Sequence, residues 1–288
     1  MTDSEREVIK EIKENYNHFS KRQKIIAEYI INHFDKAAYM TAAQLAENAG
    51  VSESTVVRFS AELGFDGYQV FQRNLREEAK RHLNSLQRIE LASEKIDNDD
   101  VLSSVLKSDV GNILSTLNEI DRKQFNGAVD ALINAEHIYI TGVRSAAALA
   151  SFMGFYFNLL FENVKLINTT GADDIFEQLL RVGKNDVVLG MSFPRYSKNT
   201  VAAMKYAADC GASVIGITDN KKSPIVRFSK YCLIARSEME SFVDSLAAPL
   251  SVVNALIVAV AMKKKQETVN TFEKLEAMWT EYEVYDKE

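Results

Sequence analysis

The clearest chemical pattern in the chain is a group of hydroxyl side chains followed by an arginine. Ser52, Ser54 and Thr55 begin a predicted helix, and Arg58 lies on the same helix face as Ser54 and Thr55. The free N–H groups and the positive dipole end of a helix favour a phosphate at this point. An arginine one turn further on is long enough to reach a guanine edge in the major groove. The pattern therefore indicates contact with DNA.

Other polar and basic residues around this helix extend the predicted interface. The full set of candidate DNA contacts is Lys21, Arg22, Thr41, Gln44, Ser52, Ser54, Thr55, Arg58, Tyr68 and Arg73. Basic side chains that contact phosphates position a protein on the duplex without reading its sequence. The acidic Glu53 and Glu62 lie near the proposed reading face and would repel phosphate. An ordinary helical bundle with serine caps, in which Arg58 is simply solvated, remains the alternative.

A second group of polar residues follows the predicted strands between residues 137 and 236. Ligands of open parallel sheets bind beyond the carboxyl ends of the strands. The candidate effector-binding residues there are Arg144, Ser145, Thr169, Thr170, Ser192, Arg195, Ser197 and Thr200. Hydroxyls and N–H groups hold anion oxygens, and arginine supplies a bidentate charge, so this set predicts an anion site. The alternative is that these residues are ordinary helix caps and loop residues.

Helices predominate in the sequence before residue 120. Ser20 is the expected N-cap of an amphipathic helix that contains Ile26, Ile30 and Phe34 in one row. Residues 41–64 have the proportions of a helix-turn-helix, with Gly50 as the expected left-handed residue of the turn. Residues 68–95 and 100–120 are expected to form longer helices that link two domains.

The hydrophobic period changes from residue 137 onwards. The five short apolar runs are HIYITG, NVKLIN, DVVLGMS, SVIGITD and YCLIAR. Their alternation with helical segments predicts a parallel sheet covered on both faces. We therefore expect two domains: an all-α helix-turn-helix bundle, and an α/β three-layer parallel sheet. The predicted boundaries are 1–84 for the DNA-binding domain, 85–120 for a helical linker and 121–288 for the sheet domain.

Composition and charge favour a cytoplasmic protein with one nucleic-acid-binding end. Residues 1–88 carry 13 basic and 13 acidic side chains, whereas residues 89–288 carry 21 and 27. The two cysteines cannot form a disulfide framework, and the charged N-terminus is not typical of a signal peptide. The uncharged stretches 145–161 and 245–262 are short for a membrane span, and we expect buried helices and no membrane contact.

The N-terminal motif resembles the DNA-binding domain of the RpiR family of bacterial transcription regulators. That family carries a pattern of the type L-A-x-x-x-x-V-S-x-x-T-V-x-R-F-x-x-x-L-G-F-x-G-Y-x-x-F. The matching residues are Leu45, Ala46, Val51, Ser52, Thr55, Val56, Arg58, Phe59, Leu63, Gly64, Phe65, Gly67, Tyr68 and Phe71. The resemblance implies a regulator that binds operator DNA.

Residues 137–236 are similar to the sugar isomerase (SIS) domain, which binds phosphosugars and usually accompanies the RpiR DNA-binding domain. SIS domains often show G-x-G-x-S after the first strand and S-x-S-G-x-T after the third. Here Arg144 stands in place of the second glycine of the first motif. Pro194 and Arg195 replace the second serine and the glycine of the second motif. By resemblance, Ser145, Ser192 and Ser197 are the ligand hydroxyls, while the extra arginines either suit a sugar acid or only fill space.

Catalysis is not expected. SIS isomerases use Glu and His near the sugar, but three of the four histidines lie in the DNA-binding part and His137 opens the first strand. Glu238 and Glu240, after the fifth strand, are the carboxylates that an isomerase hypothesis would test. No metal-ligand spacing or cofactor motif stands out.

The sequence therefore predicts a regulator of carbohydrate metabolism genes. We expect a phosphosugar or sugar-acid effector to modulate its affinity for operator DNA. It would act as a homodimer or a dimer of dimers, because a palindromic operator mirrors a two-fold axis. The uncharged stretches 145–161 and 246–262 are the predicted interface, and the tail helix is a candidate to cross to the partner. The alternatives are a sugar-phosphate isomerase and a DNA-binding protein without an effector.

Overall fold

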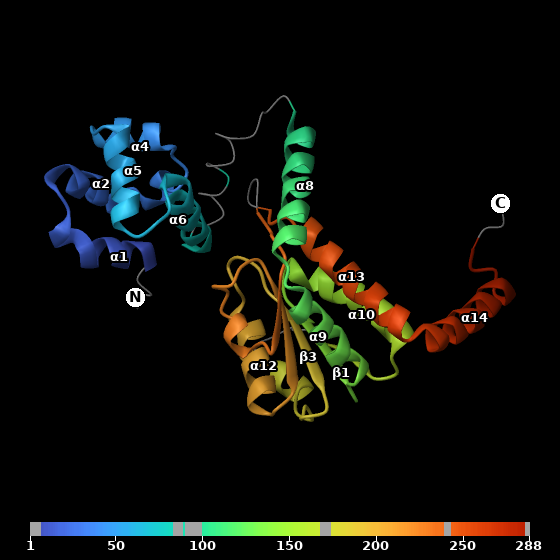
Figure 1. The fold of residues 1–288 in the computed structure, drawn as a ribbon. Coiled ribbons are helices and arrows are strands. Elements are labelled where there is room, and N and C mark those ends of the chain that lie inside the picture. The colour runs from blue at the N-terminus through green and yellow to red at the C-terminus, as the bar shows by residue number, and fades with distance from the viewer. Residues whose placement is uncertain (1–6, 83–88, 90–99, 168–173, 239–242, 286–288) are drawn as a thin grey trace. The chain divides into compact units, whose positions relative to one another are not determined.

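The computed structural model describes residues 7–82, 89, 100–167, 174–238 and 243–285. The chain divides into two compact units, residues 1–88 and residues 89–288 (Figure 1). Each unit has its own hydrophobic core, as the sequence predicts for two domains.

The first unit is entirely helical. Its elements are α1 (Glu7–Asn15), η1 (Tyr16–His18), α2 (Lys21–Asn32), α3 (Phe34–Ala37), α4 (Ala42–Ala49), α5 (Glu53–Glu62) and α6 (Tyr68–His82). The fully buried Phe59 of α5 is central to the core, and its ring centroid lies 5.0 Å from that of Phe19 and 6.0 Å from that of Phe71. Aromatic pairs at such distances add to the stability from apolar burial. This core fixes α5 against the other helices.

Two capping boxes set the starts of α2 and α4. Ser20 N–H donates to Gln23 Oε1 at 2.8 Å, and Gln23 N–H donates to Ser20 Oγ at 3.4 Å. Thr41 and Gln44 form the same reciprocal pair, at 2.9 and 3.2 Å. Each box satisfies N–H groups that an α-helix leaves unpaired at its start. The predicted N-cap at Ser20 is thus confirmed, and Thr41 caps α4 in the same way.

The second unit is an α/β domain with a five-stranded sheet. Its strands are β1 (Ile138–Gly142), β2 (Val164–Ile167), β3 (Val187–Met191), β4 (Ser213–Thr218) and β5 (Tyr231–Ile234). Its helices are α8 (Val101–Glu119), α9 (Arg122–Ile133), α10 (Ala146–Leu160), α11 (Asp174–Gln178), α12 (Lys198–Asp209), η2 (Val226–Phe228), α13 (Ala247–Lys263) and α14 (Lys265–Glu281). The strand order is β2-β1-β3-β4-β5, and all neighbouring pairs are parallel. The predicted fold class is confirmed.

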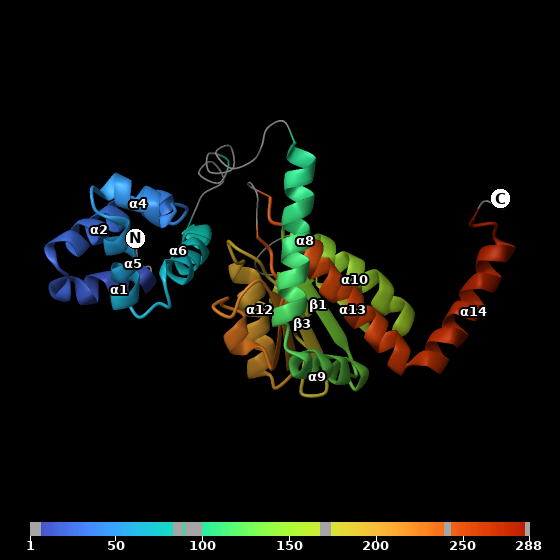
Figure 2. The same cartoon turned by 45° about the horizontal axis from the view of Figure 1, so that its top comes forward.

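Helices cover both faces of this sheet, which makes the strands nearly continuous in apolar residues. One core cluster joins α9, α10 and α13 to side chains of β1, β3, β4 and β5. The other joins α11 and α12 to the opposite face, where Tyr139 and Val188 are buried. Figure 2 shows the two helical layers on either side of the strands. The carboxyl ends of the strands are therefore framed by helix starts on both sides.

The predicted linker, residues 85–120, includes α8, and α8 packs within the second unit. Its Asn112 and Thr116 hydrogen-bond the backbone of residues 236 and 238. These contacts make α8 a part of the sheet domain, where the sequence had suggested a free connector.

No single described helix is long and apolar enough to span a membrane. Only the pair α13 and α14, which meet at a 99° bend, passes that test jointly.

Candidate functional site

Helices α4 and α5 form the predicted helix-turn-helix. Gly50 ends α4 with φ +67°, in the left-handed region that favours glycine. The N–H of Val51 then donates to the Ala46 carbonyl at 2.9 Å, which satisfies a carbonyl at the helix end. The chain turns sharply there, and α5 begins three residues after Gly50.

The start of α5 carries a cluster of hydroxyl groups. Ser52 Oγ lies 3.0 Å from Ser54 Oγ and 2.7 Å from Thr55 Oγ1. Ser52 is the N-cap residue, but its side chain makes no capping hydrogen bond to the helix backbone. The hydroxyls therefore bind one another at the positive end of the helix dipole, where a phosphate is favoured.

Arg58 lies on the exposed side of α5, while its neighbour Phe59 is buried. The sequence raised Glu62, one turn further on, as a source of repulsion toward DNA. Glu62 Oε2 accepts a hydrogen bond from Gln23 Nε2 at 2.9 Å, so this carboxylate is held by α2. The serine cluster and Arg58 thus share the exposed side of one firmly packed helix.

The other predicted DNA contacts separate into two groups. Lys21, Arg22 and Arg73 are exposed and remain candidates for phosphate contact. Thr41 and Gln44 are also exposed, but their side chains already form the capping box of α4.

Tyr68 has a packing role in the structure. It is largely buried, its hydroxyl donates to the Met40 carbonyl at 2.8 Å, and burial raises its pKa. Arg76, a further basic candidate, donates from Nε to the Ala38 carbonyl at 3.3 Å. Both side chains fasten α6 to the segment before α4, which leaves Tyr68 little surface for DNA.

The candidate effector site lies where the sheet topology reverses. The chain moves from β1 to one edge of the sheet and from β3 to the other. Open α/β sheets bind ligands at such a point, in the crevice outside the carboxyl ends of the strands. Gly142 of β1 is paired with Met191 of β3. The loops that contain Arg144 and Arg195 therefore begin side by side.

Both arginines have a left-handed backbone, with φ 58° at Arg144 and φ 64° at Arg195. Such values are uncommon for residues other than glycine and often mark functional sites. Both side chains are exposed. These are the two positions where the resembled SIS motifs carry glycine. The loops thus keep the backbone conformation that suits glycine but carry a guanidinium at each position.

Gly142 allows the helix after β1 to approach closely. A Cβ at this position would lie 2.7 Å from the Ala146 carbonyl oxygen. The start of α10 is therefore held near the end of β1, as in anion sites built from a strand, a turn and a helix.

Three of the predicted hydroxyls lie in the segments that follow β1 and β3. Ser197 is the N-cap of α12 and accepts from the Asn199 N–H at 3.2 Å. Ser145 is exposed at the start of α10 and makes no side-chain capping bond. Ser192 is buried directly after β3. Thr169 and Thr170 lie outside the described residues.

Three buried hydroxyls near the carboxyl edge have no hydrogen-bond partner among the described residues: Thr141, Thr200 and Ser223. Thr141 lies at the end of β1, Thr200 in the first turn of α12, and Ser223 in the loop after β4. Buried polar groups are normally paired, so unpaired ones call for an explanation such as a ligand or ordered water. Thr200 was predicted, whereas Thr141 and Ser223 were not selected.

The sequence analysis also missed a polar network that joins the loops after β3 and β4. Tyr196 donates its hydroxyl to Asp219 Oδ1 at 2.8 Å, and Asn220 Nδ2 lies 3.0 Å from that hydroxyl. Thr218 Oγ1 donates to the Ser192 carbonyl at 2.7 Å. The available signal was Thr-Asp-Asn directly after an apolar strand. This network fixes the loop that carries Arg195.

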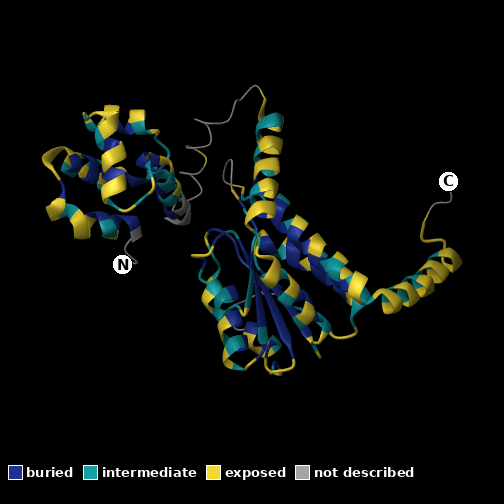
Figure 3. Cartoon of the chain, viewed as in Figure 1, coloured by how far each residue is buried: buried dark blue, intermediate teal, exposed yellow. Residues whose placement is uncertain are grey.

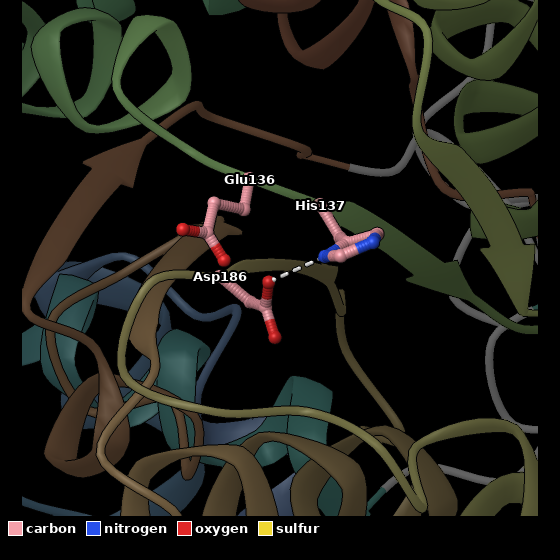
Figure 4. Close-up of side chains that lie close together, drawn as sticks. All are labelled: Glu136, His137 and Asp186. Carbon is pink, nitrogen blue, oxygen red and sulfur yellow. Dashed lines mark hydrogen bonds and ion pairs between the residues drawn. The ribbon is translucent and has the colours of Figure 1, made fainter.

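A separate cluster lies at the amino edge of the sheet, away from this crevice. There His137 Nδ1 lies 2.9 Å from Asp186 Oδ1, with Glu136 nearby (Figure 4). The other oxygen of Asp186 accepts the Gly183 N–H at 2.8 Å. One oxygen of this buried carboxylate thus holds the turn before β3, and the other joins that turn to the start of β1, which accounts for the pair structurally.

The carboxylates that an isomerase hypothesis would test are Glu238 and Glu240. The backbone N–H of Glu238 donates to Asn112 Oδ1 on α8 at 3.1 Å. Glu240 lies outside the described residues.

Comparisons with known proteins agree with both units. Residues 6–82 match the family model of the rpiR-family helix-turn-helix domain, and residues 131–259 match that of the SIS domain. An uncharacterized HTH-type transcriptional regulator of Haemophilus influenzae is 27% identical over 278 residues, which is 91% of this chain and 95% of that protein.

Two solved structures are similar as well. The sugar isomerase domain of an RpiR transcription factor from Sphaerobacter thermophilus has a TM-score of 0.59 at 26% identity, covering 62% of this chain and 99% of that chain. The NanR protein of Vibrio vulnificus, complexed with ManNAc-6P, has a TM-score of 0.57 at 21% identity and covers 94% of this chain and 97% of its own. The latter shows a shared fold over nearly the whole length.

Proposed function

Because this chain belongs to the RpiR family of helix-turn-helix transcriptional regulators with a SIS domain, we propose that it binds operator DNA through α5 under the control of an anionic sugar effector. The effector would bind at the carboxyl edge of the sheet, between β1 and β3. The protein would act in the cytoplasm on genes of carbohydrate metabolism.

The DNA-binding part of the proposal rests on the start of α5. Its hydroxyl cluster and helix dipole favour a phosphate, and Arg58 on the exposed face supplies the base contact. Lys21, Arg22 and Arg73 would add phosphate contacts that fix the orientation.

The effector-binding part of the proposal rests on the carboxyl edge of the sheet between β1 and β3, where the topology reverses. Ser192, Ser197 and Thr200 would bind the phosphate oxygens at the start of α12, together with Ser145 from α10. Arg144 and Arg195 would add two positive charges, which suits a phosphosugar or a sugar acid. The ManNAc-6P complex of NanR supports a phosphosugar in a fold of this kind.

We further propose a homodimer. The exposed face of α10 is uncharged, and so is that of α13 up to Met262. A two-fold axis would place two α5 helices on a palindromic operator. Effector binding would favour one spacing of these helices over another.

DNA binding is tested by fluorescence anisotropy with the chain's own promoter fragment at several salt concentrations. Arg58→Ala should weaken specific binding by roughly 1–3 kcal/mol, while the exposed Lys36→Ala should leave it unchanged. Two results would contradict the assignment of α5 as the DNA-binding helix. One is a promoter affinity that does not depend on salt concentration, and the other is an unchanged operator preference of Arg58→Ala.

Effector binding is tested with hexose 6-phosphates and aldonic acid 6-phosphates, with inorganic phosphate as the control. One of these compounds should change promoter affinity in the parent protein but not in Ser197→Ala. Ser213→Ala, at the amino edge of β4, should respond like the parent. A normal response of Ser197→Ala would remove that hydroxyl from the site.

A further inference from the structure

Helix α8 turns its polar face to the domain and its apolar face to solvent, which is the reverse of a normal domain helix. Its polar Asn112 and Thr116 are 4% and 6% exposed and face the domain, whereas Leu102 is 71% exposed. The solvent-facing stripe consists of Leu102, Leu106, Val110, Ile113, Leu114 and Leu117. Figure 3 shows how much of α8 is exposed. A helix normally turns its apolar face to the core, so this stripe indicates an interaction surface.

Helix α14 is the second element without a core. None of its 17 residues is buried. Its apolar side chains, including Phe272, Leu275, Trp279 and Tyr282, recur at three- and four-residue spacing and so share one face. Most of the stability of a protein helix comes from the packing of its amphipathic face, so the apolar face of α14 calls for a surface to pack on.

Helix α13 connects these two unpartnered elements. Asp109 of α8 accepts a hydrogen bond from Ser245, just before α13 begins, so α8 lies at the amino end of α13. At the other end the chain bends by 99° into α14. The start of α14 faces the end of α10 across an open cavity of about 660 Å³, and the rest extends away from the domain (Figure 1). The two apolar stripes thus lie at opposite ends of α13.

We propose that α14 of each subunit packs on the apolar stripe of α8 in a second copy of the chain. This inference rests on the homodimer proposed above. If the α13 helices pair antiparallel about a two-fold axis, the carboxyl end of each lies beside the amino end of the other. The exposed face of α13 permits this pairing, because its exposed residues Ser251, Asn254, Ala255, Val258 and Met262 carry no charge. Lys263, the last residue of the helix, is exposed and forms an ion pair with Asp130. Each α14 then begins next to the α8 of the other subunit.

The two helices also match in length. With about 1.5 Å of rise per residue, α8 (19 residues) is about 28 Å long and α14 (17 residues) about 26 Å. A two-fold axis makes the contact twice, so both α8 stripes and both α14 helices are covered at once. Pairing of α8 with α8 would leave α14 uncovered. We therefore favour the arrangement in which α14 of each subunit packs on α8 of the other.

Hydrogen–deuterium exchange on the full-length chain tests the proposal. Phe272→Asp on α14 should increase amide exchange in α8 residues 102–117 by roughly tenfold or more. Leu106→Glu on α8 should do the same for residues 268–281. The matched controls are Ala277→Asp on the opposite face of α14 and Asn118→Glu beside the α8 stripe, both exposed, and they should leave exchange unchanged.

Crosslinking identifies the occupant. In a Cys210→Ser, Cys232→Ser background, cysteines are placed on α8 of one tagged copy and along α14 of a differently tagged copy. Disulfides between the differently tagged copies support the packing of α14 on the α8 of a second copy. Disulfides only between α8 helices, or only within one chain, overturn it.

The same samples separate this inference from the proposed function. The parent protein can sediment as a dimer and bind its promoter while Phe272→Asp leaves hydrogen exchange in α8 unchanged. That result refutes the packing of α14 on the α8 of a second copy and leaves the regulator function intact. A parent protein that sediments as a monomer refutes the dimer on which the inference rests.

Discussion

Replacing Arg144 by glycine should make the sheet domain more stable and its effector response weaker. A left-handed backbone at a residue other than glycine costs about 1–2 kcal/mol. Arg144 has φ 58°, and its side chain is exposed, so little packing is lost on substitution. The greater freedom of glycine in the unfolded chain offsets about 0.5–1 kcal/mol of the gain. We therefore expect a net stabilisation of about 0.5–1 kcal/mol.

Thermal unfolding followed by circular dichroism measures this effect. A change of 1 kcal/mol moves the Tm of a domain of about 150–250 residues by about 2–4 °C, so Arg144→Gly should raise the Tm by roughly 1–4 °C. Arg144→Ala is the matched control, because alanine removes the guanidinium but keeps the strained backbone. It should reduce the effector response as Arg144→Gly does, without the gain in Tm.

Two results would refute this reasoning. A lower Tm for Arg144→Gly would mean that the arginine side chain stabilises the fold, so that its backbone is not a source of strain. An unchanged effector response in both variants would mean that the guanidinium does not contact the ligand.

Three further predictions concern the scaffold. Thr41→Ala should destabilise the helical unit by about 0.5–2 kcal/mol in thermal unfolding, because it removes the N-cap of α4. Asp186→Ala should destabilise the sheet domain by about 1–3 kcal/mol, because the part-buried Gly183 N–H loses the buried carboxylate that accepts its hydrogen bond; a Tm within a degree of the parent would contradict this. Burial raises the pKa of the Cys232 thiol to about 11, so its thiolate is scarce at lower pH. Iodoacetamide should therefore modify Cys232 slowly in the native protein at pH 8, and the rate should rise toward pH 11, as mass spectrometry of the labelled peptide would show.

Much of the fold could be predicted from the sequence because local pattern and tertiary environment agree there. Buried parallel strands need continuous apolar runs, and HIYITG corresponds to β1 at Ile138–Gly142. Gly50 in the turn and Thr41 at the N-cap follow from local backbone chemistry, which sequence reveals directly.

The remaining features depend on tertiary context. The sequence of α8 shows an apolar stripe but not that the stripe faces solvent, because the Asn112 and Thr116 contacts lie more than a hundred residues away along the chain. The left-handed backbone of Arg144 and Arg195 has no sequence signal beyond their alignment with glycines. The network of Tyr196 and Asp219 likewise joins two loops that only the sheet brings together.

The contacts of α8 join it to the edge of the sheet where the effector site is proposed. The chain leaves the carboxyl edge of the sheet after β5, and the backbone of residues 236 and 238 is bonded at once to Thr116 and Asn112. Helix α8 in turn begins just after the segment that follows the DNA-binding unit. An effector that displaced the loops at this edge would therefore act on α8. Because coupling is reciprocal, the factor by which an effector changes operator affinity must equal the factor by which operator DNA changes effector affinity.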